Sequence, residues 1–282
     1  MAKYRLGLYE KSMPNELSIT EKLKEAKESG FDYLELSIDE TDEKLARLDW
    51  TEEVYQEILH AVKALEIPIG SICLSGHRRF PLGSMDENIR NQSLDIMEKA
   101  IELASKLGAR IIQLAGYDVY YETGSEQTKQ YFLENLAHCA EMAAKAGVIL
   151  GFETMETPFM DTVKKSMDWV HQINSPYLQI YPDIGNITNA ALIYGGDPVE
   201  DLKSGHSHLV AVHLKETVPG VYREVPYGTG HVDFMAVSKE VLSQGVRMFV
   251  GEFWHTGEEN WREILRENGL FLRRILDRAS LS

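Results

Sequence analysis

Short apolar runs alternate along this chain with longer segments whose apolar residues recur at helical spacing, and this pair occurs eight times. Strands that alternate with helices are typical of a parallel sheet covered by helices. The expected strands are Arg5–Tyr9, Tyr33–Ser37, Pro68–Leu74, Arg110–Ala115, Val148–Glu153, Leu178–Asp183, Leu209–Leu214 and Arg247–Glu252. The expected helices lie near residues 18–29, 51–65, 88–107, 126–146, 161–173, 197–205, 234–244 and 258–277.

Glycines mark the ends of four expected helices. Gly30, Gly108, Gly147 and Gly245 each come shortly before the next apolar run. Glycine adopts the left-handed conformation without steric cost, so at this position it ends a helix and turns the chain back toward the sheet. This repetition supports a series of consecutive strand–helix units.

Two parallel folds compete for such a pattern, the closed barrel and the open doubly wound sheet. No G-x-G-x-x-G follows the first strand and no G-x-x-x-x-G-K-[ST] occurs, so the phosphate loops of many open-sheet enzymes are absent. The 282 residues slightly exceed the roughly 250 of a typical barrel, and no low-complexity stretch divides them. We therefore expect an α/β protein with a single (β/α)₈ TIM barrel domain over residues 1–282.

The net charge limits the partners of this chain. Asp and Glu number 44 against 29 Lys and Arg, which gives a net charge of −15 at pH 7. Such a surface repels nucleic-acid phosphates and anionic lipid headgroups, so we expect neither nucleic acid nor membrane as a partner. A small phosphorylated substrate stays compatible, because a few converging cationic or backbone N–H groups bind it locally.

Cysteine usage and the first residues indicate the compartment. Cys73 and Cys139 belong to no C-x-x-C pair, which argues against a disulfide framework and a structural zinc site. Residues 1–10 lack the apolar stretch of a signal peptide, and no later run has the length of a membrane span. We expect a cytoplasmic protein; its oligomeric state stays open, with a homo-oligomer as one option.

Four expected strands end in residues that can bind a metal ion. These are, on the fifth to eighth strands, Glu153, Asp183, His213 and Glu252. The carboxyl ends of barrel strands form the functional face, so we expect these side chains to converge. Three carboxylates and one imidazole suit one divalent ion, Mn²⁺, Zn²⁺, Mg²⁺ or Co²⁺, with positions open for substrate oxygens. Taken singly, each residue has a structural alternative, since strand-end acids often cap the next helix.

Polar residues after other strands are further candidates for substrate binding. Glu35 alternates in phase with Ser37, so it is expected to point into the barrel toward the substrate or a metal ligand, or to be a buried structural acid. After the third strand come His77, Arg78 and Arg79, whose guanidinium groups can hold a phosphate. Surface salt bridges would explain either arginine equally well.

The segment after the seventh strand supplies the remaining candidates. Lys215 shares a face with His213 by the two-residue period of a strand. The loop 218–233 adds Arg223 and His231, and its glycines lie where barrels often bind phosphate. Ordinary turns are the alternative role for these glycines.

Four strings of the sequence resemble the L-ribulose-5-phosphate/L-xylulose-5-phosphate 3-epimerases of the xylose-isomerase-like TIM barrel superfamily. They are residues 73–83, 112–121, 181–186 and 210–216. The likeness covers nearly the whole chain. In related ketose 3-epimerases the metal ligands are Glu, Asp, His and Glu at the ends of strands five to eight. The resemblance therefore implies the set already reached from the strand ends, Glu153, Asp183, His213 and Glu252.

The resemblance also implies a reaction. Its members interconvert L-ribulose 5-phosphate and L-xylulose 5-phosphate, small phosphorylated ketopentoses, through an enediolate in pentose and ascorbate catabolism. Glu153 and Glu252 are implied as the acid–base pair that removes and returns the C3 proton on opposite faces. Free-sugar 3-epimerases carry a substrate-binding His three residues after the metal Asp, whereas this chain has Asn186. Substrate contacts are therefore expected to differ from those of the free-sugar enzymes.

Other functions stay open at this point. Another ketose 3-epimerase, or an aldose–ketose or hydroxypyruvate isomerase, needs the same metal and a similar enediolate. An apurinic-site endonuclease shares the barrel but needs several metals and a basic DNA-binding surface, which the net charge of −15 argues against. A non-catalytic sugar-binding barrel is excluded by no feature of the sequence.

Overall fold

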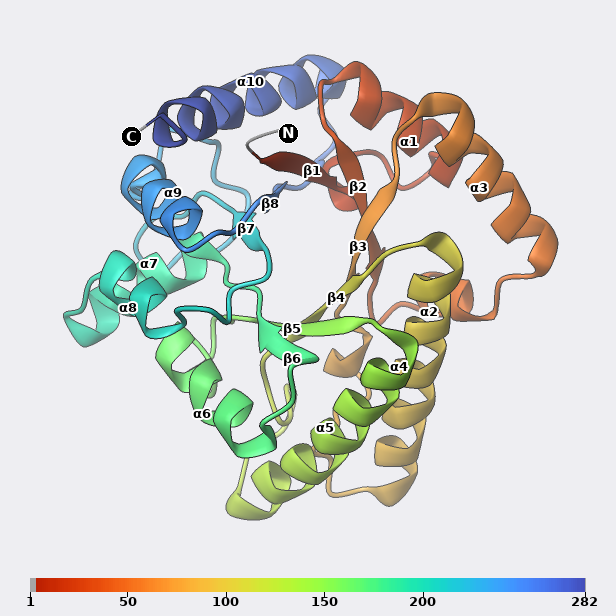
Figure 1. Ribbon diagram of the computed structural model, residues 1–282, viewed down its shortest axis with the longest axis vertical. Helices are drawn as coiled ribbons and strands as arrows, with labels where there is room; N and C mark the ends of the chain where they lie inside the picture. The colour runs from red at the N-terminus through yellow and green to blue at the C-terminus, as the bar shows by residue number, and fades with distance from the viewer. Residues whose placement is uncertain (1–3, 282) are drawn as a thin grey trace.

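The computed structural model describes residues 4–281, in which eight parallel strands form a ring with helices around it (Figure 1). The strands are β1 (Arg5–Tyr9), β2 (Tyr33–Ile38), β3 (Ile69–Leu74), β4 (Ile111–Ala115), β5 (Ile149–Glu153), β6 (Leu178–Ile180), β7 (Val212–Leu214) and β8 (Met248–Gly251). Their order in the sheet is β6-β5-β4-β3-β2-β1-β8-β7. The expected single barrel is confirmed.

The ring closes between β6 and β7 through isolated bridges, and both strands are shorter than expected. Ile180 N donates to the His208 carbonyl at 2.9 Å, and His213 N donates to the Pro182 carbonyl at 3.0 Å. Proline has no N–H to continue the ladder of β6. The closure places Asp183 directly opposite His213, so two predicted site residues become neighbours.

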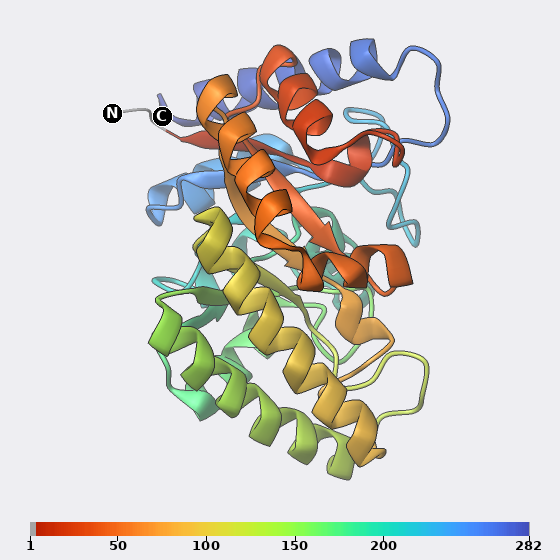
Figure 2. The ribbon, with the colours of Figure 1, turned by 90° about the vertical axis from the view of Figure 1, so that its right-hand side faces the viewer.

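The helices cover the outer face of the ring, as Figures 1 and 2 show. They are α1 (Ile19–Glu28), α2 (Asp42–Leu45), α3 (Glu52–Leu65), α4 (Glu87–Leu107), α5 (Glu126–Ala146), α6 (Val163–Ile173), α7 (Ile184–Tyr194), α8 (Pro198–Ser204), α9 (Phe234–Ser243) and α10 (Trp261–Ala279). The four glycines expected at helix ends have φ between 67° and 91°. No helix in residues 4–281 combines the length and apolarity that a bilayer crossing requires.

Helices α2 and α7 were not expected from the sequence. α7 has the sequence IGNITNAALIY, whose Gly, Asn, Thr and Ile are weak helix formers. Tertiary contacts stabilise it instead, because residues 184–190 are all buried. Asp183, expected as the last residue of a strand, is the N-cap of this helix and accepts a hydrogen bond from Asn186 N.

The interior of the barrel is filled by a large tyrosine that lies against glycines. A Cβ added to Gly7 or Gly70 would lie 2.3 Å from the ring of Tyr33, so only glycine fits at either position. The hydroxyl of Tyr33 donates to the Phe249 carbonyl at 2.9 Å. Tyr33 and Tyr181 are fully buried in the same inner cluster. This packing leaves the carboxyl ends of the strands as the face on which a site can open.

Candidate metal centre and active-site cleft

The four residues predicted from the strand ends converge in the structure. Glu153 ends β5, Asp183 follows β6, His213 lies in β7, and Glu252 follows β8. One ligand-capable atom from each lies within 4.8 Å of the others, and all four residues are buried. In Figure 2 the long loops after β4, β7 and β8 project from this same side of the barrel.

The imidazole of His213 lies between two carboxylates. Nε2 is 2.6 Å from Glu35 Oε1, and Nδ1 is 2.9 Å from Glu252 Oε2. Glu35 is itself held in place, because its Oε2 accepts from Ser71 Oγ at 2.6 Å and from the Tyr181 hydroxyl at 2.8 Å. A carboxylate behind a histidine fixes which ring nitrogen faces the metal position. Glu35 therefore contacts a candidate ligand, and its oxygens are occupied by protein groups instead of facing a substrate.

Asp183 contacts both a helix and a buried cation. Its Oδ1 accepts the N–H of Asn186 at 2.8 Å, which caps α7. Its Oδ2 is 2.8 Å from the Nζ of Lys215, and the same ammonium is 3.7 Å from Glu252 Oε2. Asp183 therefore has both roles. It caps α7, which was the structural alternative for a strand-end acid, and it lies in the metal-ligand cluster.

Crowded carboxylates set the electrostatics of the cluster. Burial raises the pKa of Asp183 to about 7; Lys215 acts against this shift, and Glu252 adds to it. Burial alone would lower the pKa of His213, but Glu35 and Glu252 outweigh it and raise that pKa well above its ordinary value. Excess negative charge in a buried site favours a bound cation.

The donor set fits a divalent ion. Three carboxylates and an imidazole are ligands that Mg²⁺, Mn²⁺, Co²⁺ and Zn²⁺ accept. The four ligand atoms are already gathered, and the Glu35–His213 contact is of the kind that orients metal-bound histidines. The buried cluster of Glu, Asp and His is therefore able to hold a metal ion.

A cleft opens above the cluster and contains four of the other predicted residues. These are Arg78, Asn186, Lys215 and Arg223. The Nδ2 of Asn186 donates to the Thr154 carbonyl at 2.7 Å. Its Oδ1 is buried and has no hydrogen-bond partner in the described part of the chain. The amide thus presents a free acceptor beside the cluster.

Arg78 and Arg223 are two cationic side chains that line this cleft. Arg223 Nη2 lies 3.5 Å from Glu156 Oε1, which also accepts from the Tyr120 hydroxyl at 3.1 Å. The guanidinium of Arg78 lies 4.6 Å from the centroid of the Tyr120 ring. Its Nε is buried without a hydrogen-bond partner among residues 4–281. The acidic partners of these two guanidinium groups are thus Glu40, 4.0 Å from Arg78 Nη1, and Glu156, and neither partner belongs to the metal-ligand cluster.

Three other predicted residues do not line the cleft. His77 is buried and its Nε2 lies 3.0 Å from the Ser93 carbonyl, while burial lowers its pKa to about 4. Arg79 turns outward and pairs with Asp42 at 2.6 Å. His231 Nε2 bonds the Thr217 hydroxyl at 2.9 Å and holds the loop after β7. Arg79 thus forms the surface salt bridge that was the alternative to phosphate binding.

Several cleft residues were missed from the sequence. Lys11, Glu156 and Trp254 line the cleft. Each lies two or three residues after the end of a strand or after a predicted metal ligand. A search that included the first few residues after each strand, and not the strand ends alone, would have found them. The loops that follow the strands, and not the strand ends alone, build the walls.

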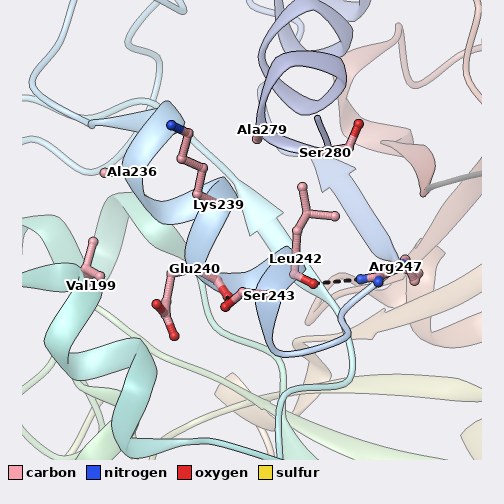
Figure 3. Close-up of a pocket in the computed structure, with 9 residues that line it drawn as sticks. All are labelled: Val199, Ala236, Lys239, Glu240, Leu242, Ser243, Arg247, Ala279 and Ser280. Carbon is pink, nitrogen blue, oxygen red and sulfur yellow. Dashed lines mark hydrogen bonds between the residues drawn. The ribbon is translucent and has the colours of Figure 1, made fainter. Parts of the chain in front are cut away.

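A larger hollow lies elsewhere, between α8, α9 and the end of α10 (Figure 3). It measures about 830 Å³ and is open to solvent. Its arginine, Arg247, is bonded to backbone carbonyls, with Nη1 2.9 Å from the Leu242 oxygen. None of the predicted site residues lines it. Size alone therefore does not identify the functional site, and the cleft above the carboxylates is the better candidate.

Comparison with known proteins places this geometry in a family. The model of the xylose isomerase-like TIM barrel family matches residues 23–275. The chain belongs to this family. Within it, the L-ribulose-5-phosphate 3-epimerase UlaE of Shigella boydii serotype 18 is 42% identical over 263 residues, which cover 93% of this chain and 91% of the relative. The resemblance inferred from the sequence strings is confirmed.

Solved structures of other proteins share the fold. A D-psicose 3-epimerase of Clostridium cellulolyticum with D-tagatose has a TM-score of 0.81 at 16% identity, covering 96% of this chain and 99% of that one. A xylose isomerase-like TIM barrel protein of Mycobacterium smegmatis in complex with magnesium has a TM-score of 0.72 at 15% identity, covering 98% and 97%. At these identities the likeness establishes the barrel fold alone.

Proposed function

We propose that this chain is a metal-dependent 3-epimerase that interconverts L-ribulose 5-phosphate and L-xylulose 5-phosphate. The observation that carries the proposal is the placement of two glutamates, Glu153 from β5 and Glu252 from β8, in one buried cluster under a cleft. The 42% identity to an L-ribulose-5-phosphate 3-epimerase over 93% of the chain supports the substrate.

Glu153, Asp183, His213 and Glu252 would hold one divalent ion, of Mn²⁺, Zn²⁺, Mg²⁺ or Co²⁺. When bound, such an ion supplies a Lewis acid that draws electron density from the C2 carbonyl of the ketose. Glu35 would keep the ring of His213 in the orientation in which Nδ1 faces the cluster.

Inversion at C3 requires two acid–base groups. One glutamate of the pair takes the C3 proton, the electrons of the C3–H bond form a C2–C3 double bond, and negative charge moves onto the C2 oxygen. The other glutamate then returns a proton to C3 from the opposite face. Glu153 and Glu252 come from strands three positions apart around the barrel, so they approach a central substrate from different sides.

Two arginines that line the cleft, Arg78 and Arg223, would bind the phosphate, because a guanidinium matches a phosphate through paired N–H donors. The buried Nε of Arg78, which has no partner in the described residues, is a donor available to a ligand. Arg79, His77 and His231 are engaged elsewhere, so these three expected substrate-binding residues are not assigned to the phosphate.

The activity is tested with a panel of pentulose 5-phosphates in deuterated water, using protein stripped of metal and then reloaded with one divalent ion. L-ribulose 5-phosphate should yield L-xylulose 5-phosphate with solvent deuterium at C3, and the stripped protein should be inactive. An aldose product would assign an aldose–ketose isomerase instead. Bound metal without any exchange at C3 would indicate a non-catalytic sugar-binding barrel.

The phosphate site is tested by replacing Arg223 with methionine. Loss of a charged hydrogen bond costs about 1.5–3 kcal/mol, so KM for the phosphorylated pentulose should rise by about 10- to 150-fold. Turnover of the free pentulose should not change. Arg79→Met is the matched control, because Arg79 is an arginine in the loop after β3 that does not line the cleft and pairs with Asp42 on the surface. Equal effects of the two substitutions, or equal use of free and phosphorylated pentulose by the unaltered enzyme, would contradict the assignment.

A further inference from the structure

Lys215 is a buried cation that lines the cleft. It follows His213 by two residues on β7 and its continuation, so both side chains point to the barrel interior. Only 4% of the residue is exposed. Its ammonium is 2.8 Å from Asp183 Oδ2 and 3.7 Å from Glu252 Oε2. The lysine thus contacts two of the candidate metal ligands, whereas the two arginines of the proposed phosphate site lie near Glu40 and Glu156.

The ammonium has donor capacity that the carboxylates do not use up. A lysine side chain carries three N–H donors. Its close oxygen contacts in the described residues are one atom of Asp183 and, at longer range, one atom of Glu252. Lys215 is also among the residues that line the cleft, so a ligand in the cleft is within reach of its ammonium. A bound ketose therefore meets a positive donor beside the same carboxylates that would exchange its proton.

We propose that Lys215 is a catalytic residue, which donates a hydrogen bond to the C2 oxygen of the ketose and stabilises the negative charge that forms there. This inference rests on the proposed 3-epimerase function. When the C3 proton passes to a glutamate, the C3–H electron pair becomes the C2–C3 double bond and the carbonyl electrons move to the C2 oxygen. Lys215 keeps all its protons throughout. A hydrogen-bond donor that is held in place near the developing charge stabilises the transition state more in a site that excludes water than it would in water.

Two other roles for Lys215 have different consequences. A phosphate anchor would act mainly on substrate binding and would raise KM. A purely structural countercharge would act through Asp183 and Glu252, so its removal would release the metal or lower the melting temperature. The proposal instead requires a fall in kcat while substrate binding and metal content persist, since the interaction strengthens only as charge develops.

The test compares Lys215→Met and Lys215→Arg with the unaltered, metal-loaded enzyme. Removing one donor to a developing oxyanion typically costs about 10²- to 10³-fold in kcat, so Lys215→Met should lose about that much. KM should stay within about threefold, and Lys215→Arg, which keeps a cationic donor, should recover part of the loss. Lys203→Met is the control, because Lys203 is an exposed partner of Glu200.

Two measurements that need no turnover accompany the kinetics. Metal stoichiometry should be one per chain in both variants. A phosphorylated pentitol, which lacks the carbonyl, should bind Lys215→Met as it binds the unaltered enzyme in calorimetry, whereas Arg223→Met should bind it more weakly. Near-normal kcat in Lys215→Met, a rise in KM alone, or loss of the metal would each overturn the proposal. Absence of epimerisation in the unaltered enzyme would overturn the proposed function itself.

Discussion

Replacing either Glu153 or Glu252 with glutamine is expected to stop inversion at C3, with kcat falling by about 10²- to 10⁴-fold, the range for loss of a general acid or base. Glutamine keeps the size of the side chain but neither accepts nor returns a proton. Because both glutamates belong to the buried cluster, each substitution also weakens the donor set for the metal. Metal content must therefore be measured in each variant before the loss is assigned to proton transfer.

Isotope exchange separates the two glutamates. In deuterated water, a variant that keeps its metal and the glutamate facing one epimer should still exchange the C3 proton of that epimer without inverting it. The other variant should show the same behaviour toward the opposite epimer. Glu122→Gln, an exposed glutamate in the loop after β4, is the control and should behave as the unaltered enzyme. Near-normal epimerisation by both variants, or product that retains its original C3 hydrogen, would rule out the two-carboxylate mechanism.

The largest expected effect on stability comes from Glu10→Gln. Glu10 is fully buried just after β1 and contacts three cations: Oε1 is 3.1 Å from Lys22 Nζ and 2.6 Å from Lys44 Nζ, and Oε2 is 2.6 Å from Arg47 Nη1. Removing the one carboxylate leaves these buried charges without their partner. Breaking a buried ion pair from one side costs about 3–5 kcal/mol, so the free energy of unfolding should fall by about that amount.

Urea unfolding of the two proteins measures this difference. Glu200→Gln is the matched control, because Glu200 pairs with Lys203 on the surface and such pairs contribute only about 0–1 kcal/mol. If the free energy of unfolding falls no more in Glu10→Gln than in the control, the buried cations are neutralised in another way.

Acid should reduce the contribution of Glu10. Burial by itself would raise its pKa, but Arg47, Lys22 and Lys44 outweigh burial and lower the pKa to about 2. An unfolded chain has the ordinary value near 4.5, so the folded state binds the proton less readily. The stabilisation is then complete above pH 4.5 and is lost as the pH falls toward 2. The difference in unfolding free energy between Glu10→Gln and the unaltered protein should shrink over that range.

The sequence determined the strand order and the ligand candidates because both depend on local periodicity. A strand–helix repeat locates the end of each strand to within a few residues, and a closed parallel barrel places all those ends on one face. Glu153, Asp183, His213 and Glu252 could therefore be proposed without coordinates. The two-residue period likewise predicted that Glu35 and Lys215 point inward.

Tertiary structure alone decided which partner each inward or loop residue meets. Glu35 bonds a histidine 178 positions away, and the ammonium of Lys215 lies 2.8 Å from Asp183 Oδ2. The loop residues His77 and Arg79 are separated by one position, yet one packs beneath α4 and the other pairs on the surface. Such outcomes depend on the course of the loops and on side-chain packing, and neither produces a periodic pattern in the sequence.

The same reason explains the features that sequence reasoning missed. α7 consists of weak helix formers and is stable because its first turns are buried against the barrel. The cations around Glu10 come from α1, α2 and the segment after α2, so they meet only when the chain is folded. Local alternation thus specified the barrel and the residues near its strand ends, whereas contacts between distant segments decided the cleft, its charges and the residues that line it.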